Sequence, residues 1–210
     1  MLDGVMRRLI GPPLDALGGA LAARGIGANQ VTLAGLIAAL GCGACAALSA
    51  PLPALALLVL SRLADGLDGA VARRTGLSDF GGYLDILADF VFYAAIPLGF
   101  ALADPSGNAV AAAVLLASFY LNAASFLGFA IFAAKRGMST DQRGPKSLYF
   151  TTGLAEGSET IGVFVAMLLA PQWFVPLAYG FAGLCLVTTA ARVALAAQVF
   201  GVDDRAPPQG

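Results

Sequence analysis

The sequence predicts an all-α, polytopic membrane protein with six transmembrane helices and one amphipathic helix on the membrane surface. Of its 210 residues, 59% are hydrophobic and only 12% are charged, whereas about a quarter of a typical soluble domain is charged. The mean hydropathy is +0.81, and the apolar residues gather in runs that match the roughly 20 helical residues needed to cross a bilayer. A chain of this size is expected to form one domain, residues 1–210.

The first segment, residues 1–26, is predicted to lie flat on the membrane as an amphipathic helix. Its apolar residues recur at helical spacing, and Arg7 and Arg8 fall on the polar side. Prolines, glycines and aspartates interrupt the segment, so it does not have the apolar core of a cleavable signal peptide.

Six apolar runs follow, within residues 31–199, and breaks rich in proline, glycine and polar residues separate them. The polar tail, residues 200–210, is predicted to be flexible. The predicted spans are residues 31–49, 52–74, 81–103, 109–134, 148–170 and 173–199.

The distribution of lysine and arginine predicts the orientation. The turns near residue 50, at 104–108 and near 171 carry neither residue. The positive-inside rule therefore places both termini and the second and fourth loops in the cytoplasm of a bacterial inner membrane. The net charge of −1 gives no reason to expect a nucleic-acid partner. The basic residues that set the orientation are Arg7, Arg8, Arg24, Arg73, Arg74, Lys135, Arg136, Arg143, Lys146 and Arg205.

Four aspartates lie in or beside the predicted spans, where a carboxylate is costly unless something compensates for it. Asp65 and Asp68 share a helix face near the end of the second span, and Asp85 and Asp89 share one near the start of the third. A short loop makes these helices antiparallel neighbours, so the carboxylates can converge near the cytoplasmic surface. Divalent cations would remove their mutual repulsion. Oxygen ligands in a chain without histidine favour hard ions, so the pattern predicts two Mg²⁺ or Mn²⁺ ions.

The spacing of this region is D-x2-D-G-x2-A-R-x7-G-x3-D-x3-D. It resembles the signature of the CDP-alcohol phosphatidyltransferase family (class I), and the rest of the chain is most similar to a little-studied bacterial branch of that family. The stretch ANQVTL resembles the family's N-x-x-T segment, which lies near the cytidine nucleotide; alternatively, Asn29 and Thr32 only cap the first span. The motif positions are Asp65, Asp68, Gly69, Ala72, Arg73, Gly81, Asp85 and Asp89.

The resemblance implies that the protein transfers a phosphatidyl group from CDP-diacylglycerol to an alcohol acceptor and releases CMP, in phospholipid biosynthesis. It implies that Asp65, Asp68 and Asp85 are the main metal ligands. Asp89 would ligate one ion and act as the general base for the acceptor hydroxyl. A homodimer is also expected from the resemblance. Nucleotide and diphosphate binding would fall to Asn29, Thr32, Gly69, Ala72, Arg73 and Gly81.

Basic residues are the candidates for binding the acceptor, since a phosphorylated polyol such as glycerol 3-phosphate would need two or three of them. For those in the loops, positive-inside bias is an alternative explanation. Arg192 lies within the sixth span, where a pocket role is preferred to snorkelling. Arg62 is expected to pair with Glu159 or Glu156 of the fifth span; alternatively, one glutamate selects the acceptor. The acceptor-binding candidates are Arg192, Lys146, Arg143 and Lys135.

Three other functions agree less well with the sequence. A transporter would also use intramembrane acids, but it gives no reason for the fixed glycines and Ala72. A membrane prenyltransferase would show a second aspartate-rich motif in the other half of the chain, which is absent from the sequence. A catalytically silent relative would have lost part of the aspartate set, and all four aspartates are present.

Overall fold

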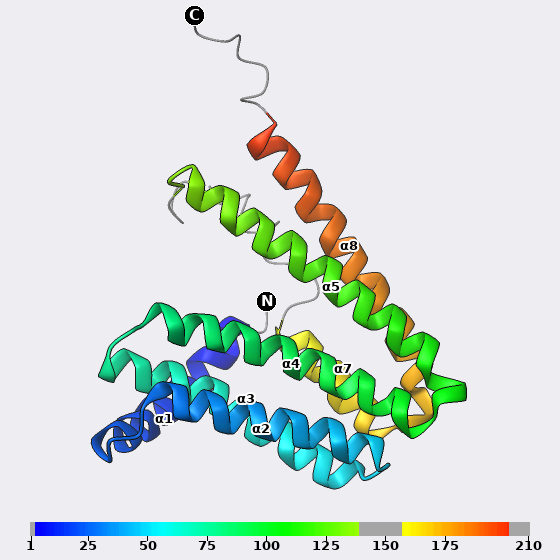
Figure 1. Cartoon of the computed structure of the whole chain (residues 1–210), viewed down its shortest axis with the longest axis horizontal. Helices are drawn as coiled ribbons and strands as arrows, with labels where there is room; N and C mark the ends of the chain where they lie inside the picture. Colours follow the sequence, from blue (N-terminus) through cyan, green and yellow to red (C-terminus); the bar gives the residue numbers. More distant parts are fainter. Residues whose placement is uncertain (1–2, 139–156, 202–210) are drawn as a thin grey trace, which may run out of the picture.

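The computed structural model describes residues 3–138 and 157–201, and every regular element in them is helical (Figure 1). The all-α prediction is therefore confirmed for this part of the chain. The elements are α1 (Asp3–Ala23), α2 (Ala28–Ala47), α3 (Pro51–Thr75), α4 (Asp79–Ala103), α5 (Pro105–Lys135), α7 (Gly157–Leu169), the 3₁₀ turn η2 (Pro171–Trp173) and α8 (Phe174–Phe200).

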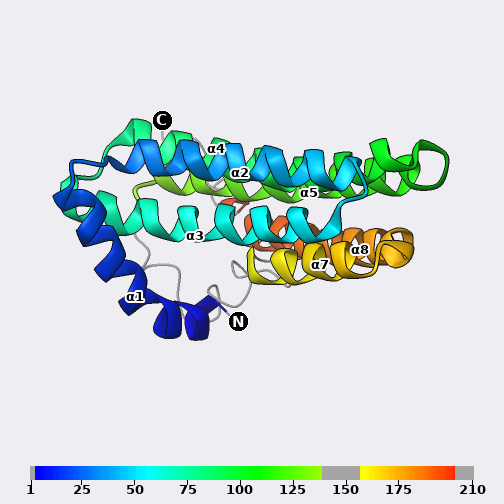
Figure 2. The same ribbon diagram turned by 90° about the horizontal axis from the view of Figure 1, so that it is seen from below.

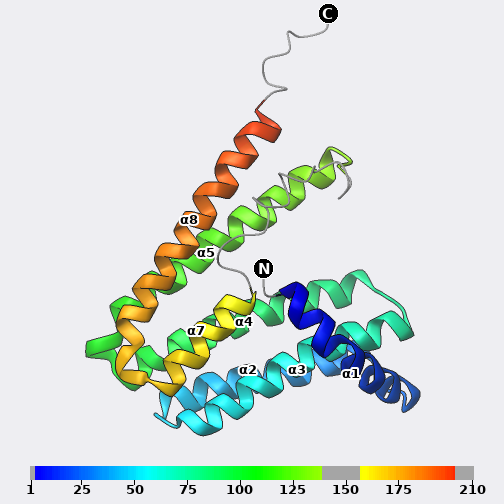
Figure 3. The ribbon, with the colours of Figure 1, turned by 180° about the vertical axis from the view of Figure 1, so that it is seen from behind.

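The helices form two groups. The first is a bundle in which α2 packs against both α3 and α4, while α1 and α7 contact α3. The second is the pair α5 and α8, which projects away from the bundle and is joined to it where α5 contacts α4 (Figure 3). The aspartate motif thus lies in the first group, on α3 and α4, and Arg192 lies in the second.

A tight turn joins α3 to α4, and each of these two helices packs mainly against α2. Gly76 follows α3 with a φ of +113°, a backbone conformation that residues with a side chain rarely adopt. Ser78 then caps α4, because its hydroxyl oxygen accepts a hydrogen bond from the Gly81 amide at 3.0 Å. This turn places the end of α3 and the start of α4, and hence the aspartates, at the same end of the bundle.

Glycines allow α2 and α4 to approach each other closely. A Cβ at Gly43 of α2 would lie only 2.5 Å from the Ala95 carbonyl oxygen of α4. A Cβ at Gly99 would in turn lie 2.9 Å from the Cβ of Ala46. Small residues at helix contacts are typical of membrane proteins, where close backbone packing drives association.

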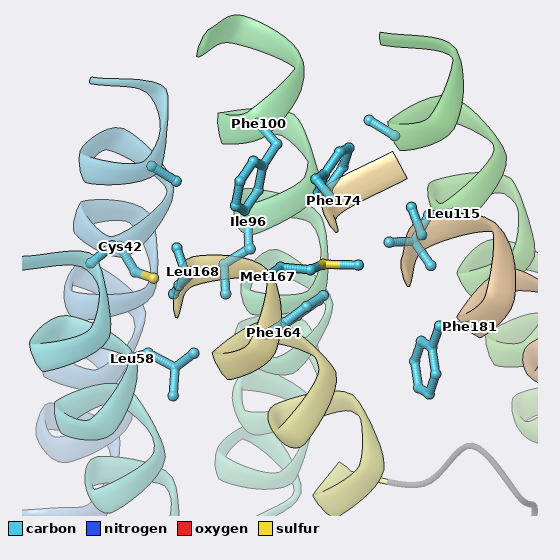
Figure 4. Close-up of a cluster of buried hydrophobic side chains, with 14 of the residues drawn as sticks. Cys42, Leu58, Ile96, Phe100, Leu115, Phe164, Met167, Leu168, Phe174 and Phe181 are labelled. Carbon is cyan, nitrogen blue, oxygen red and sulfur yellow. The ribbon is translucent and has the colours of Figure 1, made fainter. Parts of the chain in front are cut away.

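An aromatic core joins the bundle to the α5–α8 pair (Figure 4). Phe92 of α4 packs edge-to-face on Phe164 of α7, with ring centroids 5.7 Å apart. Phe100 stacks on Phe174, with centroids 4.4 Å apart. Side chains of α2, α3, α5 and α8 complete this core, which lies at the end of the bundle remote from the α3–α4 turn.

Four helical segments in the described residues are long and apolar enough to cross a membrane. They are α2, α4, α5 and the segment 171–200 that contains η2 and α8. Helix α3 has the length, 25 residues, but it carries the charged motif; α7 has 13 residues, and part of the predicted span 148–170 lies outside the described residues. Six spans are thus confirmed only in part, and crossings by α3 and α7 stay predictions.

Helix α1 packs against the end of α3 that carries the motif (Figure 2). A Cβ at Gly18 would lie 2.6 Å from the Cβ of Ala70, so this glycine allows the two helices to meet. The Asp15 carboxylate accepts a hydrogen bond from Arg73 at 2.7 Å. A helix in this segment was predicted correctly, whereas its place on the membrane surface stays a prediction.

Candidate active site

The four motif aspartates come from two facing helix ends. Asp65 and Asp68 lie in the last three turns of α3, and Asp85 and Asp89 lie in the first three turns of α4. Asp65, Asp68 and Asp85 line one small cavity of about 10 Å³ with Ser61, Arg62 and Thr32. The structure therefore brings carboxylates from both helices together, as their spacing predicts.

Asp68 is the most buried of the four and receives a hydrogen bond from α2. The Thr32 hydroxyl donates to its Oδ2 at 2.6 Å, and both residues are buried. Thr32 is not the cap of α2, which begins after Gly27; the Gln30 side chain accepts a hydrogen bond from the Gly27 amide at 2.9 Å. The alternative that Thr32 only caps this helix is therefore wrong.

The guanidinium of Arg62 on α3 contacts both Asp65 and Asp89. The Arg62 Nη1 donates to Asp89 Oδ1 at 2.9 Å and lies 3.6 Å from Asp65 Oδ1. The expected pairing of Arg62 with a glutamate of the fifth span is wrong for Glu159, whose Oε2 accepts a hydrogen bond from Ser158; Glu156 lies outside the described residues. The reason is register: Arg62 stands one turn before Asp65 on α3, and from this face its guanidinium reaches Asp89 of α4.

A larger cavity of about 380 Å³ opens beside Asp68 and Asp85. Its volume lies within the range typical of small-molecule sites. The start of α2, the end of α3 and the start of α4 contribute its walls. The lining residues include five of the six predicted nucleotide-binding residues, Asn29, Thr32, Gly69, Ala72 and Gly81, but not Arg73.

Gly81 is the tightest of the lining glycines. A Cβ there would lie 2.9 Å from the Ser78 hydroxyl oxygen and 3.1 Å from the Asn29 Oδ1. At Gly69 a Cβ would meet only Arg73 Nη1, at 3.4 Å. Arg73 therefore extends over Gly69 at the edge of the cavity, while its Nη2 donates to Asp15.

The predicted acceptor residues are not all placed by the structure. Arg192 is buried between α8 and α5, where its Nη1 donates to the Asn122 carbonyl and Oδ1, each at 2.9 Å, and to Ser125 Oγ at 2.8 Å. Lys135 is exposed at the end of α5. Neither lines either of the two cavities described above. Lys146 and Arg143 lie outside the described residues.

The carboxylates fit a hard divalent cation by their chemistry. Among residues 3–138 and 157–201, however, no group of three acidic, histidine or cysteine side chains is arranged to hold an ion. Protein partners already hold these carboxylates, Thr32 on Asp68 and Arg62 on Asp65 and Asp89. In the described residues the carboxylates therefore contact Thr32 and Arg62, and their fit to a cation rests on the chemistry of the oxygen donors.

Arg62 is the site residue whose predicted partner, a glutamate of the fifth span, is wrong. The spacing of Arg62 and Asp65 could have predicted this contact, because residues three positions apart lie on the same face of a helix. The capping pair of Gly27 and Gln30 was also missed, although both residues line the larger cavity.

Comparison with known proteins bears directly on this site. A family model described as CDP-alcohol phosphatidyltransferase matches residues 26–202, which include all the motif positions. The chain is 44% identical over 193 residues to the inner membrane protein YnjF of Escherichia coli K12, covering 92% of this chain and 94% of that protein. It is also 38% identical over 98 residues to the archaetidylinositol phosphate synthase of Pyrococcus horikoshii, covering 46% and 52% respectively.

Proposed function

The chain belongs to the CDP-alcohol phosphatidyltransferase family and is a transferase of substituted phosphate groups, and we propose that it moves a phosphatidyl group from CDP-diacylglycerol to an alcohol acceptor and releases CMP. The observation that carries this proposal is the contact between the 380 Å³ cavity and the aspartate cluster. A nucleotide in the cavity would present its diphosphate to Asp68 and Asp85.

The cavity suits a nucleotide diphosphate at its α2 wall. The first turn of α2 lines it, and helix N-termini attract anions because their amides point outward and carry a partial positive charge. Gly69 and Gly81 keep the walls free of side chains, and Ala72 adds only a methyl group. We assign Asn29, Thr32 and Arg73 to the nucleotide and its diphosphate.

The reaction forms a bond between the acceptor oxygen and the lipid-side phosphorus, and breaks the bond from that phosphorus to the CMP oxygen. We assign Asp89 as the base that takes the acceptor proton, since it stands on the side of the cluster away from the cavity lining. Members of the family generally depend on divalent metal ions. Asp65, Asp68, Asp85 and Asp89 would hold two Mg²⁺ or Mn²⁺ ions, which when bound neutralise charge on the diphosphate.

A phosphorylated polyol is the favoured acceptor class. The similarity to an archaetidylinositol phosphate synthase supports this choice, because the named product of that relative carries a phosphorylated polyol. The proposed acceptor-binding residues are Arg192, Lys146, Arg143 and Lys135.

The proposed setting is a bacterial inner membrane, which agrees with the similarity to an inner membrane protein. Both termini and the active site would face the cytoplasm, and residues 1–210 would form one domain that pairs as a homodimer. The surface-lying α1 would bring Asp15 to the cytoplasmic end of α3, where the structure pairs it with Arg73.

CMP release from CDP-diacylglycerol and Mg²⁺ tests this function. The acceptor panel would be glycerol 3-phosphate, inositol 1-phosphate, inositol, serine, glycerol and phosphatidylglycerol. Release with one acceptor, abolished by Asp89→Asn, would support the proposal and identify the product. No release with any acceptor, and no binding of nucleotide or Mn²⁺, would refute it and favour a carrier with intramembrane carboxylates.

A further inference from the structure

Arg62 brings a positive charge into the aspartate cluster, although it is not one of the motif positions. Resting on the function proposed above, we propose that Arg62 is a positioning residue. Its guanidinium acts as an internal counterion that holds the Asp65 and Asp89 carboxylates in the metal-free protein and must release them when a divalent cation binds.

The geometry of Arg62 supports a bridging role. A single nitrogen, Nη1, lies 2.9 Å from Asp89 on α4 and 3.6 Å from Asp65 on α3. Two carboxylates this close to one another repel unless a positive charge stands between them. Arg62 thus supplies in the metal-free protein the charge that a cation would otherwise supply.

Arg62 is held in this place by two further contacts. Its guanidinium carbon stacks 3.8 Å from the ring centroid of the fully buried Phe92, and its Nη2 donates to Ser61 Oγ at 3.2 Å. Its Nε is buried and has no hydrogen-bond partner among the described residues. A buried donor without a partner costs free energy, so the other contacts of this guanidinium hold it in place.

Arg62 lies on the side of the aspartate cluster that faces the small cavity. It lines the small cavity with Asp65, Asp68 and Asp85, but it does not line the larger cavity that would take the nucleotide. The carboxylates next to that cavity are Asp68 and Asp85. Arg62 would therefore oppose a cation at Asp65 and Asp89, without blocking the nucleotide.

This arrangement links cation binding to donor binding. A cation and the guanidinium together would bring excess positive charge to one place, which weakens cation binding. The negative charges of a nucleotide diphosphate would offset this excess. By linkage, the diphosphate should strengthen cation binding, and the cation should strengthen diphosphate binding by the same factor.

Mn²⁺ binding to the purified full-length protein tests the proposal without relying on turnover. Free Mn²⁺ is followed by electron paramagnetic resonance in wild type and in Arg62→Met, Arg62→Gln and Arg62→Lys. Arg136→Met is the matched control, because Arg136 also faces an aromatic ring and donates hydrogen bonds, but at the far ends of α5 and α8. Each titration is repeated with CDP.

The neutral variants should bind Mn²⁺ about tenfold more tightly than wild type, since a neighbouring charge changes such equilibria by about one to three powers of ten. The lysine variant should be intermediate, because one ammonium cannot stack on Phe92 and bridge both carboxylates. CDP should strengthen Mn²⁺ binding more in wild type than in Arg62→Met. The Arg136 variant should match wild type.

The proposal is overturned if no folded Arg62 variant binds Mn²⁺ more tightly than wild type; the glutamine and lysine variants decide this if the methionine variant does not fold. Failure of the proposed reaction would look different. In that case wild type would release no CMP, while the Arg62 variants would still shift Mn²⁺ affinity.

Discussion

Removing the Thr32 hydroxyl tests whether α2 takes part in catalysis by holding Asp68. Thr32→Val keeps the shape of the side chain but removes the donor that stands 2.6 Å from Asp68 Oδ2. Asp68 is only 6% exposed, so water does not readily replace that donor.

The magnitude follows from the type of hydrogen bond that is lost. A hydrogen bond to a charged group contributes about 1.5–3 kcal/mol. The free enzyme also loses this hydrogen bond, so only part of its free energy affects the activation barrier. We therefore take the lower end of the range, about 1.5 kcal/mol. That value corresponds to a decrease of about tenfold in kcat/KM for the CDP-linked donor.

The assay is the initial rate of CMP release over a range of donor concentrations, for wild type, Thr32→Val and Thr32→Ser. The serine variant retains the hydroxyl and should stay close to wild type. If the valine variant keeps kcat/KM within a factor of two, or if serine falls as far as valine, the Thr32–Asp68 contact does not support catalysis.

Three further predictions concern the proposed nucleotide cavity, the contact between α2 and α4, and the cap of α5. Gly81→Ala should raise KM for the donor about tenfold, because its Cβ would crowd Asn29 Oδ1 at 3.1 Å. Gly162→Ala in α7 is the control, because a Cβ there meets nothing within 4 Å and Gly162 lines neither cavity; equal KM values in both variants would contradict the assignment. Gly43→Ala should destabilise the protein by about 1–3 kcal/mol through overpacking against the Ala95 carbonyl, measured as a lower Tm in detergent; an unchanged Tm would show that α2 and α4 can separate at little cost. Asp104 caps α5, and hydrogen bonds from Ser106 Oγ and the Gly107 amide lower the pKa of its carboxyl below the ordinary 3.8. Its contribution is therefore present above pH 3.8 and is lost as pH falls through the lower folded pKa, so the Tm difference between wild type and Asp104→Ala should shrink in acid, and a constant difference would contradict this cause.

Local patterns in the sequence identified the elements well. The turn at Gly76 and Ser78 was predicted as a break between two apolar runs, and the structure ends α3 and begins α4 there. The four-residue spacing of Asp85 and Asp89 placed both on one helix face, where they lie. These predictions succeed because helical periodicity and capping depend on residues only a few positions apart.

Contacts between distant residues were predicted less well. Arg62 was expected to pair with a glutamate of the fifth span because buried charges are usually paired, yet it pairs with Asp89. Depth along a helix does not reveal which way a side chain faces, and the rotation of α3 relative to α4 and α7 decides that. The place of Arg192 between Asn122 and Ser125 likewise depends on how α5 packs against α8.

The sequence by itself determined that this chain is helical and apolar, that it carries a complete aspartate motif, and that the motif belongs to a phosphatidyltransferase family. Composition and short-range spacing are sufficient for these conclusions, because each depends on residue type or on positions within one or two helices. The tertiary structure alone decided that Thr32 holds Asp68, that Arg62 bridges Asp65 and Asp89, and that a cavity of about 380 Å³ opens beside Asp68 and Asp85. These features arise where three helices meet, and the packing of small residues such as Gly43, Gly81 and Gly99 sets how closely those helices approach.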